Sequence, residues 1–213
     1  MDSQSDFRTR LFAKIAQANG KQSLPENLTA SFQQLINGTK GQQSGLAPIA
    51  DCLAAFKENA RLAACELFEV ISLSEINTLL SERMPAGANL MVSPQPALQP
   101  CEWSVATTDN AREAQWGLAL AEIAIAETGS VCLHSEAVAT GLLYLVETLI
   151  VVVQQSQIVA RQEEAWQQMH IGTGQRPRAL HMITGPSRTA DVEQMLQLGA
   201  HGPREVLIFI LAN

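Results

Sequence analysis

The chain has 213 residues, a formal net charge of −7 and a hydrophobic fraction of 46%. A chain of this length and composition buries its own core, so wholesale disorder is excluded and neither disulfides nor a structural metal is required. Aromatic residues make up only 5%, which predicts a core of Ala, Leu, Ile and Val side chains. The excess of 21 Asp and Glu over 14 Lys and Arg argues against a basic face that binds nucleic acid.

The cysteines are spread along the chain with no CxxC pair among them: Cys52, Cys65, Cys101 and Cys132. Zinc and iron–sulfur sites need thiolates clustered at short spacing, so this spacing predicts neither a metal site nor another cofactor. We expect buried thiols in a reducing compartment, with a single catalytic cysteine as the alternative.

The first residues are polar and acidic, without the basic and apolar regions of a signal peptide. The longest aliphatic runs, Leu149–Val153 and Val206–Ala212, are too short to span a bilayer. We therefore expect a cytoplasmic protein without a membrane-inserted segment.

The N-terminal part of the chain is predicted to be separate from the main domain. Apolar residues at helical spacing predict a helix over Ser5–Ala18. Asn19–Gly45 is rich in Gln, Asn, Gly, Ser and Lys, which indicates a surface linker with a short helix around Phe32–Ile36. We expect residues 1–45 to be an appendage and residues 46–213 to form an α/β domain.

From residue 46 onward, predicted helices alternate with predicted strands. Ser93–Pro100 holds three prolines and is predicted to be a loop. The other elements of this stretch are a helix over Leu46–Ala60, a strand over Glu66–Val70, a helix over Ser74–Arg83 capped by Ser74, a strand over Ala88–Val92 and a helix over Asp109–Gly117 capped by Asp109.

The second half continues the alternation. Glu122–Ala126 and Ser130–Leu133 flank a Thr-Gly turn, which predicts a tight hairpin. Thr148–Val153 is a β-branched run, typical of a strand buried on both faces. The remaining elements are a helix over Ile158–Met169, a loop over Gly172–Arg178, a strand over Ala179–Thr184, a loop over Gly185–Arg188, a helix over Thr189–Leu198, a loop over Gly199–Pro203 and a strand over Glu205–Leu211. This order predicts an α/β fold with a mostly parallel sheet.

The sharpest candidate for a binding site is the segment Thr184–Asp191, which leaves a predicted strand and enters a predicted helix. Ligands of open α/β sheets bind at such points, where free N–H groups and the helix dipole attract anions. A glycine allows close backbone approach, and hydroxyls and a guanidinium suit a carboxylate or phosphate. Alternatively, a hydroxyl only caps the helix and the arginine pairs with a helix carboxylate. The residues concerned are Gly185, Ser187, Arg188, Thr189 and Asp191.

A second candidate is the predicted hairpin turn around Glu127. A carboxylate aimed into a cleft there is a candidate catalytic base, metal ligand or acceptor for a hydroxyl, with Thr128 and Gly129 beside it. The alternative is an exposed hairpin residue.

A third candidate is His201, which lies between Gly199 and Gly202 on the loop before the last strand. Glycine permits positive φ on either side and so allows a tight loop that presents the imidazole. In a βαβ unit this loop lies at the opposite edge of the sheet from the Gly185 loop, so His201 need not share a site with Arg188. A structural histidine bonded to backbone is the alternative.

Two motifs in this order carry a family resemblance: IAETGS at Ile125–Ser130 and ITGPSRTADVEQMLQLGAHGPREVLIFIL at Ile183–Leu211. From about residue 46 to its C-terminus the chain resembles the lactate-utilisation protein C family, also called the LUD domain family. The resemblance implies a three-layer α/β/α fold with a mostly parallel sheet, of the NagB/RpiA/CoA-transferase type.

The resemblance also implies a bacterial, cytoplasmic role in oxidising L-lactate to pyruvate. The chain would be a non-redox subunit that binds a small carboxylate or phosphate, beside iron–sulfur and oxidoreductase subunits that carry the redox chemistry. The family motifs map onto Glu127–Gly129, Gly185–Asp191 and His201–Pro203.

In one stretch the chain departs from the family. Ala139–Val146 lacks the basic residue and the proline that relatives often have. If that basic residue contacts an anion in relatives, this chain binds a different ligand or binds more weakly. Two other functions stay open: an enzyme acting on a sugar phosphate or CoA ester, with Glu127 as base or nucleophile, and a purely structural or regulatory assembly subunit.

Overall fold

The computed structural model describes residues 10–11, 13–15, 17–18, 47–169, 177–192, 195–198 and 201–212. The chain divides into two compact units, Met1–Ala47 and Pro48–Asn213. In the first unit the described residues between Arg10 and Ala18 are helical, in agreement with the predicted helix there. The predicted linker helix at Phe32–Ile36 lies outside the described residues.

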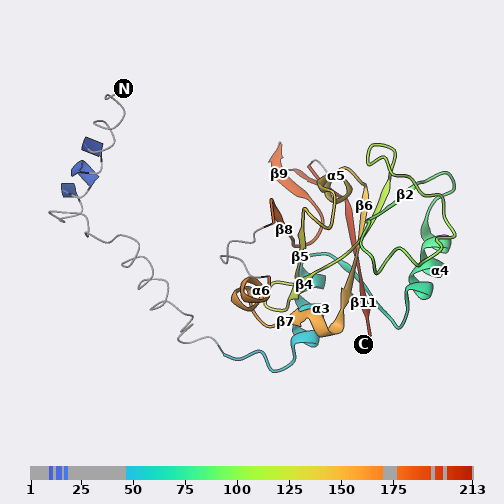
Figure 1. The fold of residues 1–213 in the computed structure, drawn as a ribbon, viewed down its shortest axis with the longest axis horizontal. Coiled ribbons are helices and arrows are strands. Elements are labelled where there is room, and N and C mark those ends of the chain that lie inside the picture. The colour runs from blue at the N-terminus through green and yellow to red at the C-terminus, as the bar shows by residue number, and fades with distance from the viewer. Residues whose placement is uncertain are drawn as a thin grey trace. The chain divides into compact units, whose positions relative to one another are not determined.

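The second unit is built on a sheet of five parallel strands in the order β1-β11-β6-β3-β2 (Figure 1). The predicted mostly parallel sheet is thus confirmed. The central strands read as unbroken apolar runs because both of their faces are buried. The strands are β1 (Glu66–Val70), β2 (Leu90–Val92), β3 (Trp116–Leu120), β6 (Thr148–Gln154) and β11 (Glu205–Leu211).

A second sheet of four strands has the order β7-β4-β5-β8. β4 (Ile123–Ile125) and β5 (Ser130–His134) form the antiparallel hairpin that the Thr-Gly turn predicted. β8 (Leu180–Ile183) pairs with β5, and β7 (Ile158–Val159) pairs with β4. The strand predicted at Ala179–Thr184 is therefore confirmed, but it belongs to this sheet and not to the parallel one.

The described part of the second unit has four α-helices: α3 (Cys52–Leu62), which precedes β1, and α4 (Leu73–Arg83), α5 (Thr140–Tyr144) and α6 (Gln162–Gln168), which lie between strands. A 3₁₀ turn, η1, follows β6 at Gln155–Gln157. None of the described helices is long and apolar enough to cross a membrane.

The helix caps correct two of the predicted boundaries. α3 begins only at Cys52, because the Asp51 side chain accepts a hydrogen bond from the Ala54 N–H (2.9 Å) and starts the helix there. The N-cap of α4 is Ser72, whose hydroxyl accepts from the Glu75 N–H (3.3 Å), and not Ser74.

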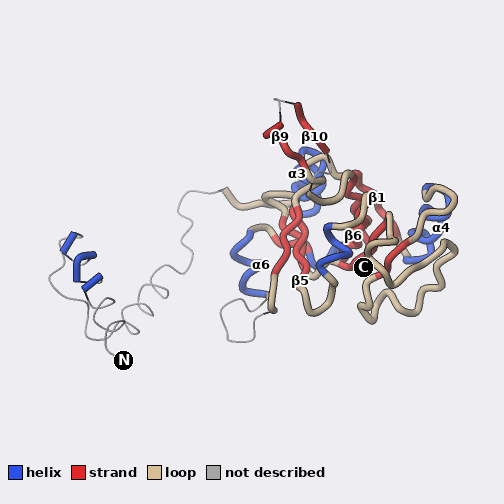
Figure 2. The backbone as a smooth tube through the Cα atoms, turned by 90° about the horizontal axis from the view of Figure 1, so that it is seen from above, coloured by secondary structure: helices blue, strands red, loops and turns tan. Residues whose placement is uncertain are grey.

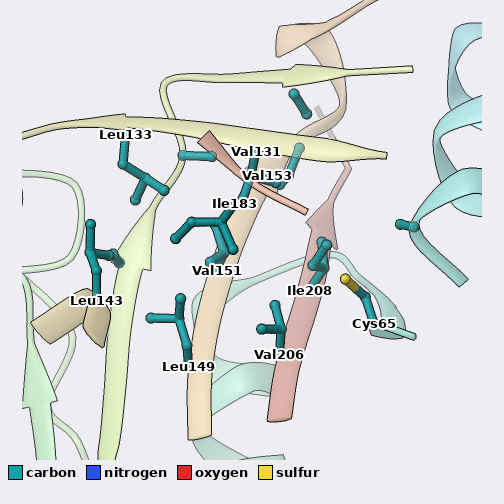
Figure 3. Close-up of a cluster of buried hydrophobic side chains, with 14 of the residues drawn as sticks. Cys65, Val131, Leu133, Leu143, Leu149, Val151, Val153, Ile183, Val206 and Ile208 are labelled. Atoms are coloured by element: carbon teal, nitrogen blue, oxygen red, sulfur yellow. The ribbon is translucent and has the colours of Figure 1, made fainter. Parts of the chain in front are cut away.

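Two apolar layers flank the central sheet. On one face, α4 packs over Ile150, Val152 and Phe209. On the other face, α3, α5 and the second sheet enclose a layer that includes Val151 and Ile208 (Figure 3). Alternate residues of β6 and β11 thus supply the two layers, as the period of a strand requires.

Two predicted helices are wrong. Asp109–Gly117 is instead a turn followed by the first residues of β3, because the Asn110 side chain accepts from the Arg112 N–H (3.1 Å) and bonds Glu113 Oε1 (2.7 Å). Thr189–Leu198 is replaced by two antiparallel strands, β9 (Arg188–Val192) and β10 (Met195–Leu198).

The strands β9 and β10 form a two-stranded sheet of their own. Figure 2 shows this hairpin standing away from the two larger sheets.

The predicted helix over Ile158–Met169 is shorter than expected. Its first two residues, Ile158–Val159, join the second sheet as β7, and α6 is the helical part.

Candidate functional site

The two motif turns around Gly129 and Gly185 pack on the C-terminal end of α3. Gly129 has φ 67° and Gly185 has φ 76°, a region that favours glycine. A Cβ at Gly129 would overlap the backbone at Ala60, and one at Gly185 would overlap the carbonyl oxygen of Ala63. The glycines therefore serve close packing of three segments that are distant in the sequence.

A chain of hydroxyls links the same two turns. Ser130, 1% exposed, lies 2.7 Å from Thr128 Oγ1 and 2.6 Å from Thr184 Oγ1 through its own Oγ. Each of these oxygens can donate to one neighbour and accept from another, so the buried Ser130 hydroxyl is satisfied without water. Thr128, which was predicted to bind a ligand, is thus part of the hydrogen-bond chain that joins the two motif turns.

The carboxylate of Glu127 is held in an ion pair. Its Oε2 lies 3.0 Å from Nη1 of Arg161, and its Oε1 accepts a hydrogen bond from the Gln162 N–H (2.8 Å). Gln162 is the first residue of α6, so Glu127 satisfies a free N–H at that helix start. Both carboxylate oxygens are therefore engaged at the start of α6.

Arg188 lies beside the end of α3. Its Nη2 donates a long hydrogen bond to the Ala63 carbonyl oxygen (3.4 Å). Burial raises the pKa of the nearby Cys65 thiol to about 11, against the lowering effects of the Gly185 backbone hydrogen bond and the Arg188 charge. Arg188 therefore contributes to the packing of the motif turns on α3.

The expected anion site at a helix N-terminus is not formed, because the residues after Arg188 are strand β9 and not a helix. Extended strands have no aligned set of free N–H groups and no sizeable dipole, so the physical basis of that expectation is lost. The side chains of Thr189 and Asp191, which were part of it, lie outside the described side chains.

An open cleft of about 470 Å³ lies at the start of strands β6 and β11. We call it the strand-start cleft; it is lined by residues 144–147 and by His201, Gly202 and Arg204. The Arg204 and Glu147 side chains are exposed and form no hydrogen bond or ion pair with any other described residue. The cleft thus presents a free guanidinium, a free carboxylate and an imidazole.

Tyr144 forms one wall of this cleft and connects it to the second sheet. Its hydroxyl lies 3.1 Å from His181 Nδ1, and the two rings meet edge to face at 5.4 Å between centroids. Thr140 Oγ1 lies 3.4 Å from the other ring nitrogen of His181. The His181 ring is therefore oriented by two residues of α5.

The loop of His201 and the loop of Gly185 are neighbours, which corrects the sequence argument that set them at opposite edges of a sheet. The Ser187 N–H donates to the Pro203 carbonyl oxygen (2.9 Å), and a Cβ on Gly202 would lie 3.2 Å from Ser187 Cβ. The loops meet because β8 belongs to the second sheet and the chain returns through the β9–β10 hairpin. Ser187, His201 and Gly202 thus lie together, while Glu127 and Arg188 have partners elsewhere.

Sequence reasoning missed the three other polar residues of the cleft: Tyr144, Glu147 and Arg204. Tyr144 is the only tyrosine of the chain and stands in an aliphatic stretch, which was a usable signal. Glu147 and Arg204 precede apolar strands directly, and only strand pairing brings them together.

Comparison with known protein sequences shows the family of the chain. The profile of the LUD domain matches residues 102–211. The chain is 30% identical over 191 residues to a protein named lactate utilization protein C from Geobacillus thermodenitrificans, covering 76% of this chain and 79% of that one. A protein of the same name from Geobacillus sp. (strain WCH70) is 33% identical over 109 residues, but the match covers only 45% of its length.

The fold is similar to that of a solved structure, a DUF162 family protein from Deinococcus radiodurans. The TM-score is 0.60 with 16% sequence identity, and the match covers 76% of this chain and 97% of that one. At this identity the likeness concerns the fold, and it agrees with the α/β architecture described above.

Proposed function

The chain belongs to the LUD domain family, and on that basis we propose that it is a component of bacterial L-lactate utilisation. The observation that carries the proposal is the 30% identity over 191 residues with a lactate utilization protein C. In this role the chain is a cytoplasmic subunit that binds a small carboxylate. Iron–sulfur and oxidoreductase subunits carry the electrons when L-lactate is oxidised to pyruvate.

The spacing of the cysteines supports a subunit that carries no iron–sulfur cluster of its own. Cys52, Cys65, Cys101 and Cys132 form no CxxC pair, whereas such clusters are held by thiolates at short spacing in the sequence.

Growth of a deletion strain tests the role. Removing the gene from its host is expected to abolish growth on L-lactate as sole carbon source and to leave growth on pyruvate unchanged. A plasmid copy of the full chain restores growth on L-lactate. Normal growth of the deletion strain on L-lactate contradicts the proposal.

The partner part of the proposal needs a separate measurement. The full chain, tagged and expressed in its host during growth on L-lactate, is expected to co-purify with proteins that bring iron and sulfide in stoichiometric amounts.

The ligand is tested by thermal unfolding of the purified chain. Stabilisation by sugar phosphates or CoA, but not by lactate or pyruvate, contradicts the carboxylate-binding role and favours an enzyme that acts on a sugar phosphate or CoA ester.

A further inference from the structure

We propose that the strand-start cleft binds 2-hydroxycarboxylates as a class, with Arg204 holding the carboxylate and Glu147 accepting a hydrogen bond from the 2-hydroxyl. The choice of ligand class rests on the proposed function, whereas the place and the two residues come from the geometry of the cleft.

The Arg204 guanidinium supplies the anion-binding group. It lines the cleft, it is exposed, and it has no ion-pair or hydrogen-bond partner among the described residues. A guanidinium presents two parallel N–H groups that match the two oxygens of a carboxylate. By contrast, Arg83 and Arg161 are occupied by carboxylates of the protein itself.

The backbones that carry the two groups are fixed to each other. The N–H groups of Arg204 and Glu205 both donate to the Glu147 carbonyl oxygen, at 2.8 and 3.2 Å. On the other side, the Ser187 N–H holds the Pro203 carbonyl oxygen at 2.9 Å. The side chains of Arg204 and Glu147 are therefore attached to backbone that is fixed where two core strands begin. This lowers the entropic cost of arranging the two side chains around a ligand.

The exposed carboxylate of Glu147 gives the cleft a preference between ligands of equal charge. A 2-hydroxy acid can donate its hydroxyl proton to this carboxylate. A 2-oxo acid offers only an acceptor there, so two acceptors face each other without a proton between them. The cleft should therefore favour the hydroxy acid, because discrimination is strong where a polar group of the site would be left unpaired.

The size of the cleft points to a class of ligands and not to lactate alone. Its volume of about 470 Å³ is more than a three-carbon acid needs, and pockets for larger ligands measure roughly 300–1,000 Å³. Tyr144 and Leu145 line the cleft and are 39% and 59% exposed. They offer an apolar surface against which the carbon chain of a longer 2-hydroxy acid can pack. Longer 2-hydroxy acids should bind at least as tightly as lactate.

Calorimetric titration of the purified full chain with L-lactate, 2-hydroxybutyrate, pyruvate and propionate tests the proposal. We expect saturable binding of both hydroxy acids and weaker binding of pyruvate and of propionate, neither of which has a 2-hydroxyl to donate to Glu147. Arg204→Gln should weaken the binding of L-lactate by about tenfold or more, as loss of a charge-assisted pair implies. Glu147→Gln should reduce the preference for L-lactate over pyruvate.

Matched controls come from exposed residues outside the cleft, Arg61→Gln on α3 and Glu82→Gln on α4, which should bind L-lactate like the unaltered chain. Circular dichroism and thermal unfolding of each variant show that it is folded. Unchanged affinity for L-lactate in Arg204→Gln, or equal binding of lactate and pyruvate by the unaltered chain, overturns the proposal.

The binding experiment and the growth experiment can fail independently of each other. If the deletion strain fails on L-lactate but the chain binds none of the hydroxy acids, the cleft assignment is wrong and the cellular role stands. If the chain binds them through Arg204 but growth is normal, the binding site stands and the cellular role is wrong.

Discussion

Gly129 and Gly185 both rest on the end of α3, the first against Ala60 and the second against Ala63. They come from different motifs, and both have positive φ. The motifs that carry the family resemblance are therefore first of all packing requirements at one junction. Two exposed side chains without a partner among the described residues, Glu147 and Arg204, line the strand-start cleft instead.

Replacing Gly129 by alanine should destabilise the fold strongly. The new Cβ would overlap the backbone at Ala60, and the residue would also keep an unfavourable positive φ. We expect the free energy of unfolding to fall by more than about 3 kcal/mol in a urea titration. Gly87→Ala is the control, since Gly87 has φ 84° but nothing lies within 4 Å of its Cβ position; it should cost only about 1–2 kcal/mol. Equal losses for both variants contradict the packing explanation.

Glu127→Gln should weaken the attachment of α6. The change removes the ion pair with Arg161 and weakens the hydrogen bond that satisfies the Gln162 N–H. We expect a loss of about 1–3 kcal/mol in unfolding free energy, with L-lactate affinity retained in calorimetry. Glu163→Gln, an exposed carboxylate in the first turn of α6, is the control and should change little. A stable Glu127→Gln protein that no longer binds L-lactate would restore Glu127 as a ligand-contacting residue.

Ser130→Ala should leave two hydroxyls without their shared partner. Ser130 is buried and bridges Thr128 and Thr184. Loss of a buried hydrogen-bonding group costs about 1–3 kcal/mol, which thermal or urea unfolding measures. Ser81→Ala removes an exposed hydroxyl that bonds within α4 and should cost less than about 0.5 kcal/mol. A Ser130→Ala loss no larger than that of Ser81→Ala counts against a structural hydroxyl chain.

Alkaline pH should destabilise the fold through Cys65 and Cys132. Their pKa is raised from an ordinary value of 9.0 to about 11 by burial. Between these values the unfolded chain loses the thiol protons while the folded chain keeps them. The contribution of the two thiols to stability is therefore constant below pH 9.0 and falls as pH rises toward 11. Unfolding titrations across this range should show a smaller decline in Cys132→Ala than in the unaltered chain. An identical decline means that the Cys132 thiol does not titrate as described.

Local pattern was enough for elements with a strong signal in the sequence itself. The β-branched run of β6, the Thr-Gly turn between β4 and β5, and the strand Glu66–Val70 were all predicted with little or no shift of their ends. It was not enough for Thr189–Leu198, where a short apolar repeat suits a helix or a strand and tertiary context decides between them.

The sequence by itself determined the family, the parallel α/β architecture and the motif turns, because these depend on local periodicity and on glycine conformations written directly into the chain. Only the tertiary structure decided which polar groups are free. Glu127 and Arg188 turned out to have partners, whereas Glu147 and Arg204 meet across the pairing of β6 with β11. That pairing joins residues far apart in the sequence, and no local pattern records which of their side chains it leaves exposed.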